Sequence, residues 1–68
     1  MNITEISKKY NISEAFLGSK EDGLMIAAAS LKDLQNALDA NQPRGEIKAK
    51  MQFLIDFLTD LKNSSWTA

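Results

Sequence analysis

The chain has 68 residues, of which 44% are hydrophobic and 25% charged, and it contains neither cysteine nor histidine. This length allows one small domain, and the missing residue types exclude disulfides, zinc–thiolate sites and catalysis by cysteine or histidine. The net charge of −1 disfavours capture of nucleic acid or anionic membranes by bulk charge. We therefore expect residues 1–68 to form a single helical domain with no catalytic, cofactor-binding or metal-binding residues.

The N-terminal segment is expected to contain a helix over residues 3–10. Asn2 and Glu5 have the spacing of a capping pair. Apolar residues recur on one face of this helix, at Ile3, Ile6 and Tyr10. Asn11 follows, a residue type that adopts the left-handed conformation found at many helix ends. A second, shorter helical element is predicted over residues 14–17.

A long helix is expected over residues 20–40. Ser19 and Asp22 have the spacing of a capping pair at its start. A seam of apolar residues follows in steps of three and four: Leu24, Ala27, Leu31, Leu34 and Leu38. Residues 24–29 are apolar on every side, and a helix of this kind is normally enclosed all round. We therefore expect other helices to cover this part on all sides.

A second long helix is expected over residues 43–62, after a short connection that contains Pro43. Its apolar seam consists of Ile47, Met51, Leu54, Leu58 and Leu61. Because the connection is short, the two long helices should lie antiparallel. The predicted fold is all-α, an antiparallel helical hairpin over residues 20–40 and 43–62 with the short N-terminal segment packed across it.

The second long helix has more apolar surface than one neighbour can cover. Phe53, Ile55 and Phe57 widen its apolar arc to about 200°. Either the N-terminal segment or a second copy of the chain must cover the remainder. Because a core of this size rarely supplies more than about 3–5 kcal/mol, we expect a homo-oligomer, most simply a homodimer. An open polymer built from heterologous contacts is another possibility.

Residues 6–13 resemble the front half of a helix-turn-helix motif. Ser7 stands at the small position of the first helix, and Asn11 stands at the turn. The resemblance implies DNA contacts by four residues, Lys8, Lys9, Ser13 and Lys20. Residues 14–18 depart from the motif, because they offer no arginine, glutamine or asparagine to a base edge.

Charged residues elsewhere are expected to be structural. Asp56 and Asp60 stand one helical turn apart, which is typical of a solvated helix face. Glu21 and Asp22 place negative charge at a helix start, where it complements the helix dipole. The basic cluster near the hairpin turn is more typical of a soluble helix start than of a docking patch, and it consists of Arg44, Lys48 and Lys50.

The aromatic residues offer two interpretations. Four of them would form one core cluster, namely Tyr10, Phe16, Phe53 and Phe57; alternatively, Phe53 and Phe57 lie in an intermolecular interface. Trp66 either folds back onto an apolar groove or anchors a partner.

The sequence favours a small non-enzymatic protein–protein interaction protein, such as an adaptor, an inhibitor or an assembly chaperone. It would act through apolar helix faces and bind a second copy of itself and another protein. The predicted interface residues are Met25, Ala28, Phe53, Phe57 and Trp66. The alternative is a small DNA-binding regulator of the helix-turn-helix type that uses residues 4–17. Because the first residues show no signal-peptide pattern, we expect a cytoplasmic protein.

Overall fold

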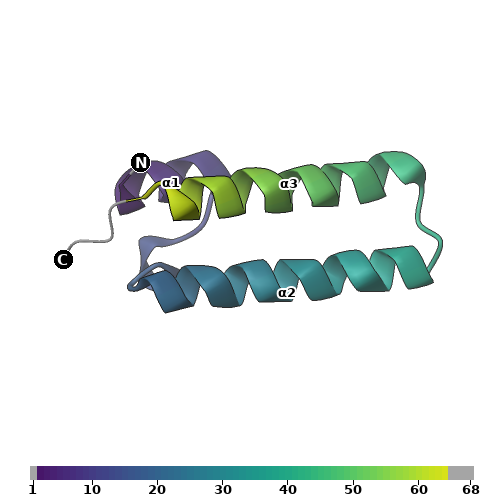
Figure 1. The fold of residues 1–68 in the computed structure, drawn as a ribbon, viewed down its shortest axis with the longest axis horizontal. Helices are drawn as coiled ribbons and strands as arrows, with labels where there is room; N and C mark the ends of the chain where they lie inside the picture. Colours follow the sequence, from purple (N-terminus) through teal and green to yellow (C-terminus); the bar gives the residue numbers. More distant parts are fainter. Residues whose placement is uncertain (1, 65–68) are drawn as a thin grey trace.

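Four helical elements make up residues 2–64, the part of the chain that the computed structural model describes. They are α1 (Ile3–Tyr10), the single 3₁₀ turn η1 (Glu14–Phe16), α2 (Lys20–Asp39) and α3 (Arg44–Lys62). Residues 2–64 contain no strand. The two long helices run antiparallel, and α1 lies beside the C-terminal half of α3 (Figure 1). The predicted all-α hairpin with a short N-terminal helix is confirmed.

The helix ends follow the predicted capping residues. The Asn2 side chain accepts a hydrogen bond from the Glu5 backbone N–H at 2.9 Å, and the Glu5 carboxylate accepts one from the Asn2 N–H. Asn11 then ends α1 in the left-handed conformation, with φ at 54°. At the start of α2, the Ser19 hydroxyl accepts a hydrogen bond from the Asp22 N–H at 3.2 Å. Local chemistry therefore determines where these helices begin and end.

The hairpin core contains unusually small residues on the α2 side. Gly23 and Ala27 are buried in α2, and Leu54 and Leu61 are buried in α3. A Cβ atom added at Gly23 would lie 2.7 Å from Cδ2 of Leu61, which is closer than two carbon atoms can approach. The missing side chain at Gly23 therefore lets the first turn of α2 lie against the last turn of α3.

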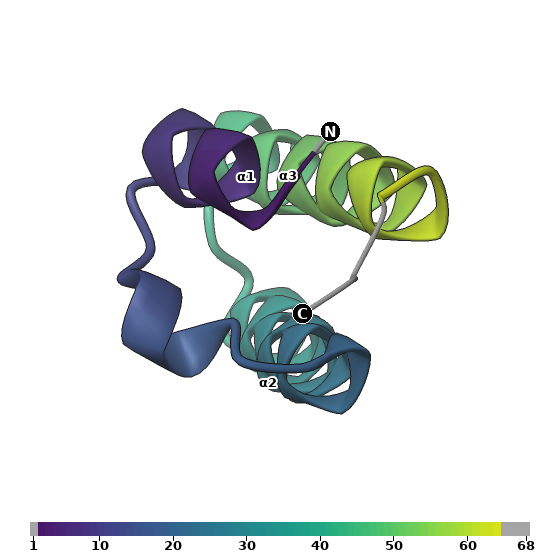
Figure 2. The ribbon, with the colours of Figure 1, turned by 90° about the vertical axis from the view of Figure 1, so that its left-hand side faces the viewer.

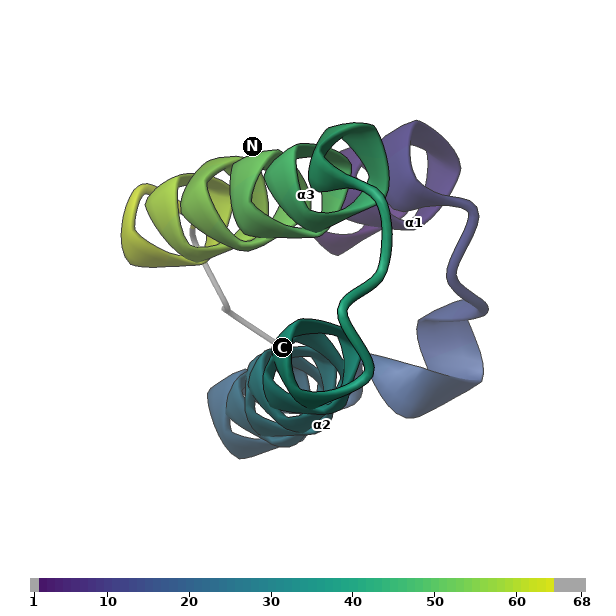
Figure 3. The same ribbon diagram turned by 90° about the vertical axis from the view of Figure 1, so that its right-hand side faces the viewer.

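The N-terminal segment covers one long edge of the hairpin. Viewed along the hairpin, α1 lies beside α3 and η1 lies on the same side, next to α2 (Figures 2 and 3). Ile6 of α1 and Leu17 after η1 are fully buried, and both belong to the same core cluster as Leu54 and Phe57. We call this covered side the α1 edge.

The predicted seam of α2 divides into two rows. Ala27 and Leu34 are buried against α3. Leu24, Leu31 and Leu38 remain between 52% and 58% exposed. The prediction that residues 24–29 are enclosed on all sides is therefore wrong for the single chain, because no described element lies against that side of α2.

Candidate interaction surface

Six large apolar side chains are exposed along the edge of the hairpin opposite α1. Their exposed fractions lie between 44% and 58%. We call this surface the bare face; its residues are Leu24, Leu31 and Leu38 of α2 and Met51, Ile55 and Leu58 of α3. Contiguous apolar patches of this kind are uncommon on monomeric proteins and mark interaction sites.

Helix geometry places both halves of this face on the same side. On α3, Phe53 packs against Tyr10 of α1, and Met51 and Ile55 each stand two residues away from Phe53. Two residues correspond to a rotation of about 200°, so they point to the side away from α1. On α2, Ile26 lies with η1 residues around a shared hollow, and Leu24 lies on the opposite flank. Both helices therefore direct apolar residues toward the edge that α1 leaves open.

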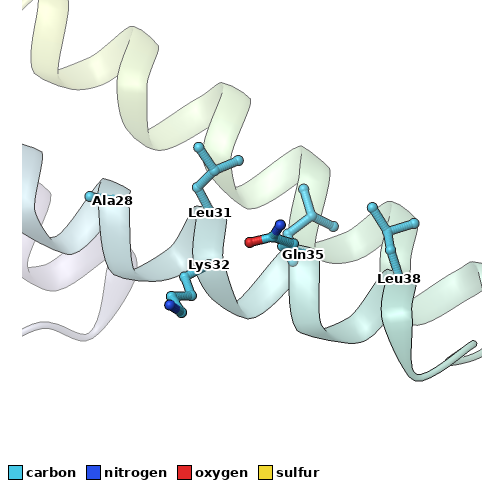
Figure 4. A pocket seen from close by; sticks show the side chains of 6 residues that line it. Ala28, Leu31, Lys32, Gln35 and Leu38 are labelled. Carbon is cyan, nitrogen blue, oxygen red and sulfur yellow. The ribbon is translucent and has the colours of Figure 1, made fainter.

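A hollow of about 500 Å³ runs along the α2 half of the bare face. The residues that line it are Ala28, Leu31, Lys32, Leu34, Gln35 and Leu38. In Figure 4, Leu31 and Leu38 project from α2 toward α3, whereas Lys32 points away from them. Because the three exposed leucines of α2 are spaced by seven residues, this row has the geometry of a coiled-coil seam.

On the opposite side, the α1 edge contains an aromatic cluster. The Tyr10 ring meets Phe53 and Phe57 edge to face, with centroid distances of 5.5 and 5.1 Å. Phe53 and Phe57 are stacked at 5.4 Å. The predicted core cluster thus forms with three of its four aromatic residues, and Phe16 lies outside it with 66% exposure. Phe57 is fully buried and Phe53 half-buried, so Phe57 presents no surface to a partner.

Asp60 joins α3 to α1 through two polar contacts. Its Oδ2 lies 2.8 Å from the Lys9 Nζ and accepts a hydrogen bond from the Tyr10 hydroxyl. Burial, followed by this hydrogen bond, raises the pKa of Tyr10 to about 12. The contacts from Lys9 and Tyr10 lower the pKa of Asp60. The prediction that Asp60 belongs to a solvated face is therefore wrong, because this residue faces α1.

The predicted interface residues fall in different places. Ala28 lines the hollow of the bare face. Met25 is 69% exposed but lies with Phe16 beside a separate hollow of about 300 Å³ under η1. Trp66 lies outside the described residues. An interface role for these residues stays a prediction.

The residues proposed for DNA contact are arranged differently from those of a helix-turn-helix. Lys8 is exposed, whereas Lys9 is paired with Asp60. The Ser13 hydroxyl caps η1 by accepting a hydrogen bond from the Ala15 N–H at 3.3 Å. Lys20 begins α2. The element that should enter the major groove is the three-residue η1, which is shorter than a recognition helix.

The leucines of the bare face were predicted as part of the hairpin seam. Sequence reasoning missed them as a separate surface because both rows of α2 are apolar. The two rows differ in the size of their side chains. Gly23 and Ala27 are small and permit close helix approach. The large Leu24 and Leu31 follow them by one and four residues, respectively. Small residues let two helices approach closely, and the row that faces α3 contains three of them, Gly23, Ala27 and Ala37.

Other kinds of site have little support in this structure. Across residues 2–64, no three acidic side chains gather in a way that could hold a metal ion. Among the described residues, neither of the two long helices has an apolar stretch long enough to cross a bilayer. In the comparisons with known proteins, no family model, curated protein or solved structure matches the chain. The bare face is therefore the feature from which a function can be argued.

Proposed function

We propose that this chain is a small, non-enzymatic protein–protein interaction protein that self-associates through its bare face. The observation that carries this proposal is the row of six half-exposed apolar side chains opposite α1. Removing such side chains from water is the main driving force of association. The six side chains of the bare face are all uncharged, so burying them carries little desolvation cost.

The size of the face supports a dimer that dissociates on dilution. A helix of 19 or 20 residues is about 30 Å long, and two helices side by side are about 20 Å wide. The bare face therefore offers about 600 Å² per chain, or about 1,200 Å² for a pair. Specific interfaces begin at about this size, and permanent ones are usually larger. We expect association that depends on protein concentration.

Light scattering behind size exclusion, over about a hundredfold in concentration, tests this proposal. The mass should rise from that of one chain to that of two. Leu31→Lys, at the centre of the bare face, should keep the chain monomeric, because it places an ammonium group in the buried interface. Met25→Lys is the matched control, since Met25 is also more than half exposed on the same helix but lies off the bare face.

Three results would contradict or redirect the proposal. A folded monomer at every concentration would argue against self-association and would leave the bare face to a different protein. A mass that grows without a fixed end point would indicate heterologous contacts and an open polymer. If Met25→Lys abolished the dimer and Leu31→Lys did not, the interface would lie around η1 instead.

The alternative, a DNA-binding regulator that uses residues 4–17, has one favourable observation. Asn11 adopts the left-handed turn that the motif requires. This alternative predicts duplex binding at about 50 mM salt that weakens when Lys8 and Lys9 become alanine. Absence of binding under those conditions would rule it out.

A further inference from the structure

The charges that border the bare face differ between its two helices. On α2, Glu21 precedes Leu24 by three residues, and Asp39 follows Leu38 directly. On α3, Lys48 precedes Met51 by three residues, and Lys62 follows Leu58 by four. Since these spacings place side chains along the outer margin of the apolar rows, each helix has its own charged rim.

These rim charges have no ion-pair partner within the described chain. Among residues 2–64, ion pairs form only between Lys9 and Asp60 and between Lys50 and Asp33. Both pairs lie on the α1 edge, since Asp33 and Lys50 share a hollow with Phe53. The exposed rim of the bare face is left with unpaired charges: Lys20, Glu21, Lys32 and Asp39 on α2, and Arg44, Lys48 and Lys62 on α3.

Two contacts fix which rim residues lie level with each other. Gly23 lies against Leu61 near one end of the hairpin. Glu21 lies two residues before Gly23, and Lys62 lies one residue after Leu61. Glu21 and Lys62 therefore lie at the same height along the hairpin. Asp33 pairs with Lys50 nearer the other end. Six further residues on each helix bring Asp39 level with Arg44. Acidic residues of α2 and basic residues of α3 therefore occupy matching heights at both ends.

Two arrangements can join two bare faces with twofold symmetry. In the first, the axis runs parallel to the helices, and α2 of each copy packs on α3 of the other. Glu21 then meets Lys62 of the second copy, and Asp39 meets its Arg44. In the second, the axis runs across the helices, and α2 packs on α2. Glu21 then meets Asp39 of the second copy, so that like charges face each other.

We infer that the chain forms an antiparallel four-helix bundle in which α2 of each copy packs on α3 of the other. This inference rests on the proposed function, since it specifies the partner and the pairing at the same bare face. Two cations of α2 also border the bare face. Lys32 lies level with the uncharged Gln52 region, and Lys20, which is exposed one helical turn before Leu24, lies level with the uncharged Asn63.

Charge reversal distinguishes the two arrangements. In the inferred bundle, Glu21→Lys places like charges together at two symmetric positions and should weaken the dimer about tenfold. Lys62→Glu should weaken it to a similar degree. An equimolar mixture of the two variants should restore wild-type affinity, because each reversed residue then meets an opposite charge. The α2-on-α2 arrangement predicts that each variant alone dimerises more tightly than wild type.

The dissociation constants would be measured by analytical ultracentrifugation at low salt, with far-ultraviolet circular dichroism to confirm folding. Asp56→Lys is the matched control, because it changes the net charge by the same amount on an exposed position away from both rims. It should leave the affinity unchanged. The effect of Glu21→Lys should also disappear at high salt, where exposed charges are screened.

The outcomes separate the inference from the function on which it rests. A monomeric wild-type chain would overturn both. A wild-type dimer that Glu21→Lys leaves unchanged or strengthens would overturn the pairing alone. If Glu21→Lys unfolds α2 by removing a favourable charge from its first turn, the second pair decides the question: Asp39→Lys and Arg44→Glu should each weaken the dimer, and their equimolar mixture should restore it.

Discussion

The two long edges of this hairpin have similar apolar content but different surroundings. On the α1 edge, Phe53 and Phe57 are covered by Tyr10, and polar contacts to Asp60 hold the covering helix in place. On the other edge, Leu31 and Ile55 are more than half exposed. Charges are paired within the chain on the first edge and unpaired on the second. The first edge is therefore complete in one chain, whereas the second has the composition of an interface.

This contrast shows how a chain of this length can divide its apolar surface. The eight-residue α1, together with η1, covers part of one side of two helices that are each more than twice as long as α1. The remaining side has no covering segment among residues 2–64. A chain of this size gains little stability from its own core, so burial of the second side by association would add a substantial share.

The largest effect on stability is expected when one apolar side chain is removed from each edge and the two losses are compared. Phe57→Ala should lower the free energy of unfolding by about 3–5 kcal/mol, because Phe57 is fully buried among aromatic rings. This loss equals the whole expected stability of the core, so the chain should be largely unfolded. Ile55→Ala should change it by about 0.5 kcal/mol or less in the monomer. Far-ultraviolet circular dichroism without denaturant measures the folded fraction of Phe57→Ala, and urea unfolding at low protein concentration measures Ile55→Ala. A Phe57→Ala chain that stays as stable as Ile55→Ala would contradict the distinction.

A smaller effect should appear when the polar contacts of the α1 edge are titrated. Because the pKa of folded Tyr10 is raised to about 12, its contribution to stability is complete below pH 10 and is lost as the pH rises toward 12. The pKa of Asp60 is lowered, so its contribution is present above the ordinary value of 3.8 and is lost as the pH falls below it. Urea unfolding across this range should show a plateau between these limits.

Tyr10 is the only tyrosine, so its phenolate absorbance reports this contact directly. Asp60→Asn should bring the pKa of Tyr10 down toward 10 without reaching it, because burial remains. Tyr10→Phe keeps the ring and should cost about 1 kcal/mol. An unchanged titration in Asp60→Asn would show that the hydroxyl does not interact with this carboxylate.

The smallest effect is expected for the second ion pair of the α1 edge. Asp33→Asn removes the partner of Lys50 in a pair whose carboxylate is 62% exposed. We expect a loss of about 0.5 kcal/mol at low salt and none at high salt. Thermal unfolding at two salt concentrations measures it. A loss that exceeds that of Tyr10→Phe would mean that surface charge, rather than the aromatic cluster, dominates this edge.

The helices could be predicted from the sequence because their signals are local. Asn2 with Glu5, and Ser19 with Asp22, mark helix starts that the structure reproduces. The rotation of each long helix could not be predicted in the same way. Both rows of α2 are apolar, so the pattern alone does not determine which row faces α3. In the structure, α3 is rotated so that Phe57 and Asp60 contact Tyr10, which lies about 50 residues away in the sequence.

The rotation of the long helices also determines which residues belong to the candidate site. Ala28 was predicted in the interface and lines the hollow of the bare face. Phe57 was predicted there as well, but the structure places it inside the α1 edge. A residue type alone does not distinguish these positions, since an aromatic side chain suits a core and an interface equally. Only the placement of α1, set by contacts distant in sequence, separates them.

The separation of α1 from its partner residues has a consequence for synthesis. Tyr10 and Asp60 are 50 residues apart, and α2 is made between them. A ribosome therefore releases α1 well before the helix that α1 must cover. Neither edge of the hairpin exists until α3 emerges. At that point α1 has already been synthesised and can cover one of the two edges. The order of translation thus favours closing the α1 edge within the same polypeptide.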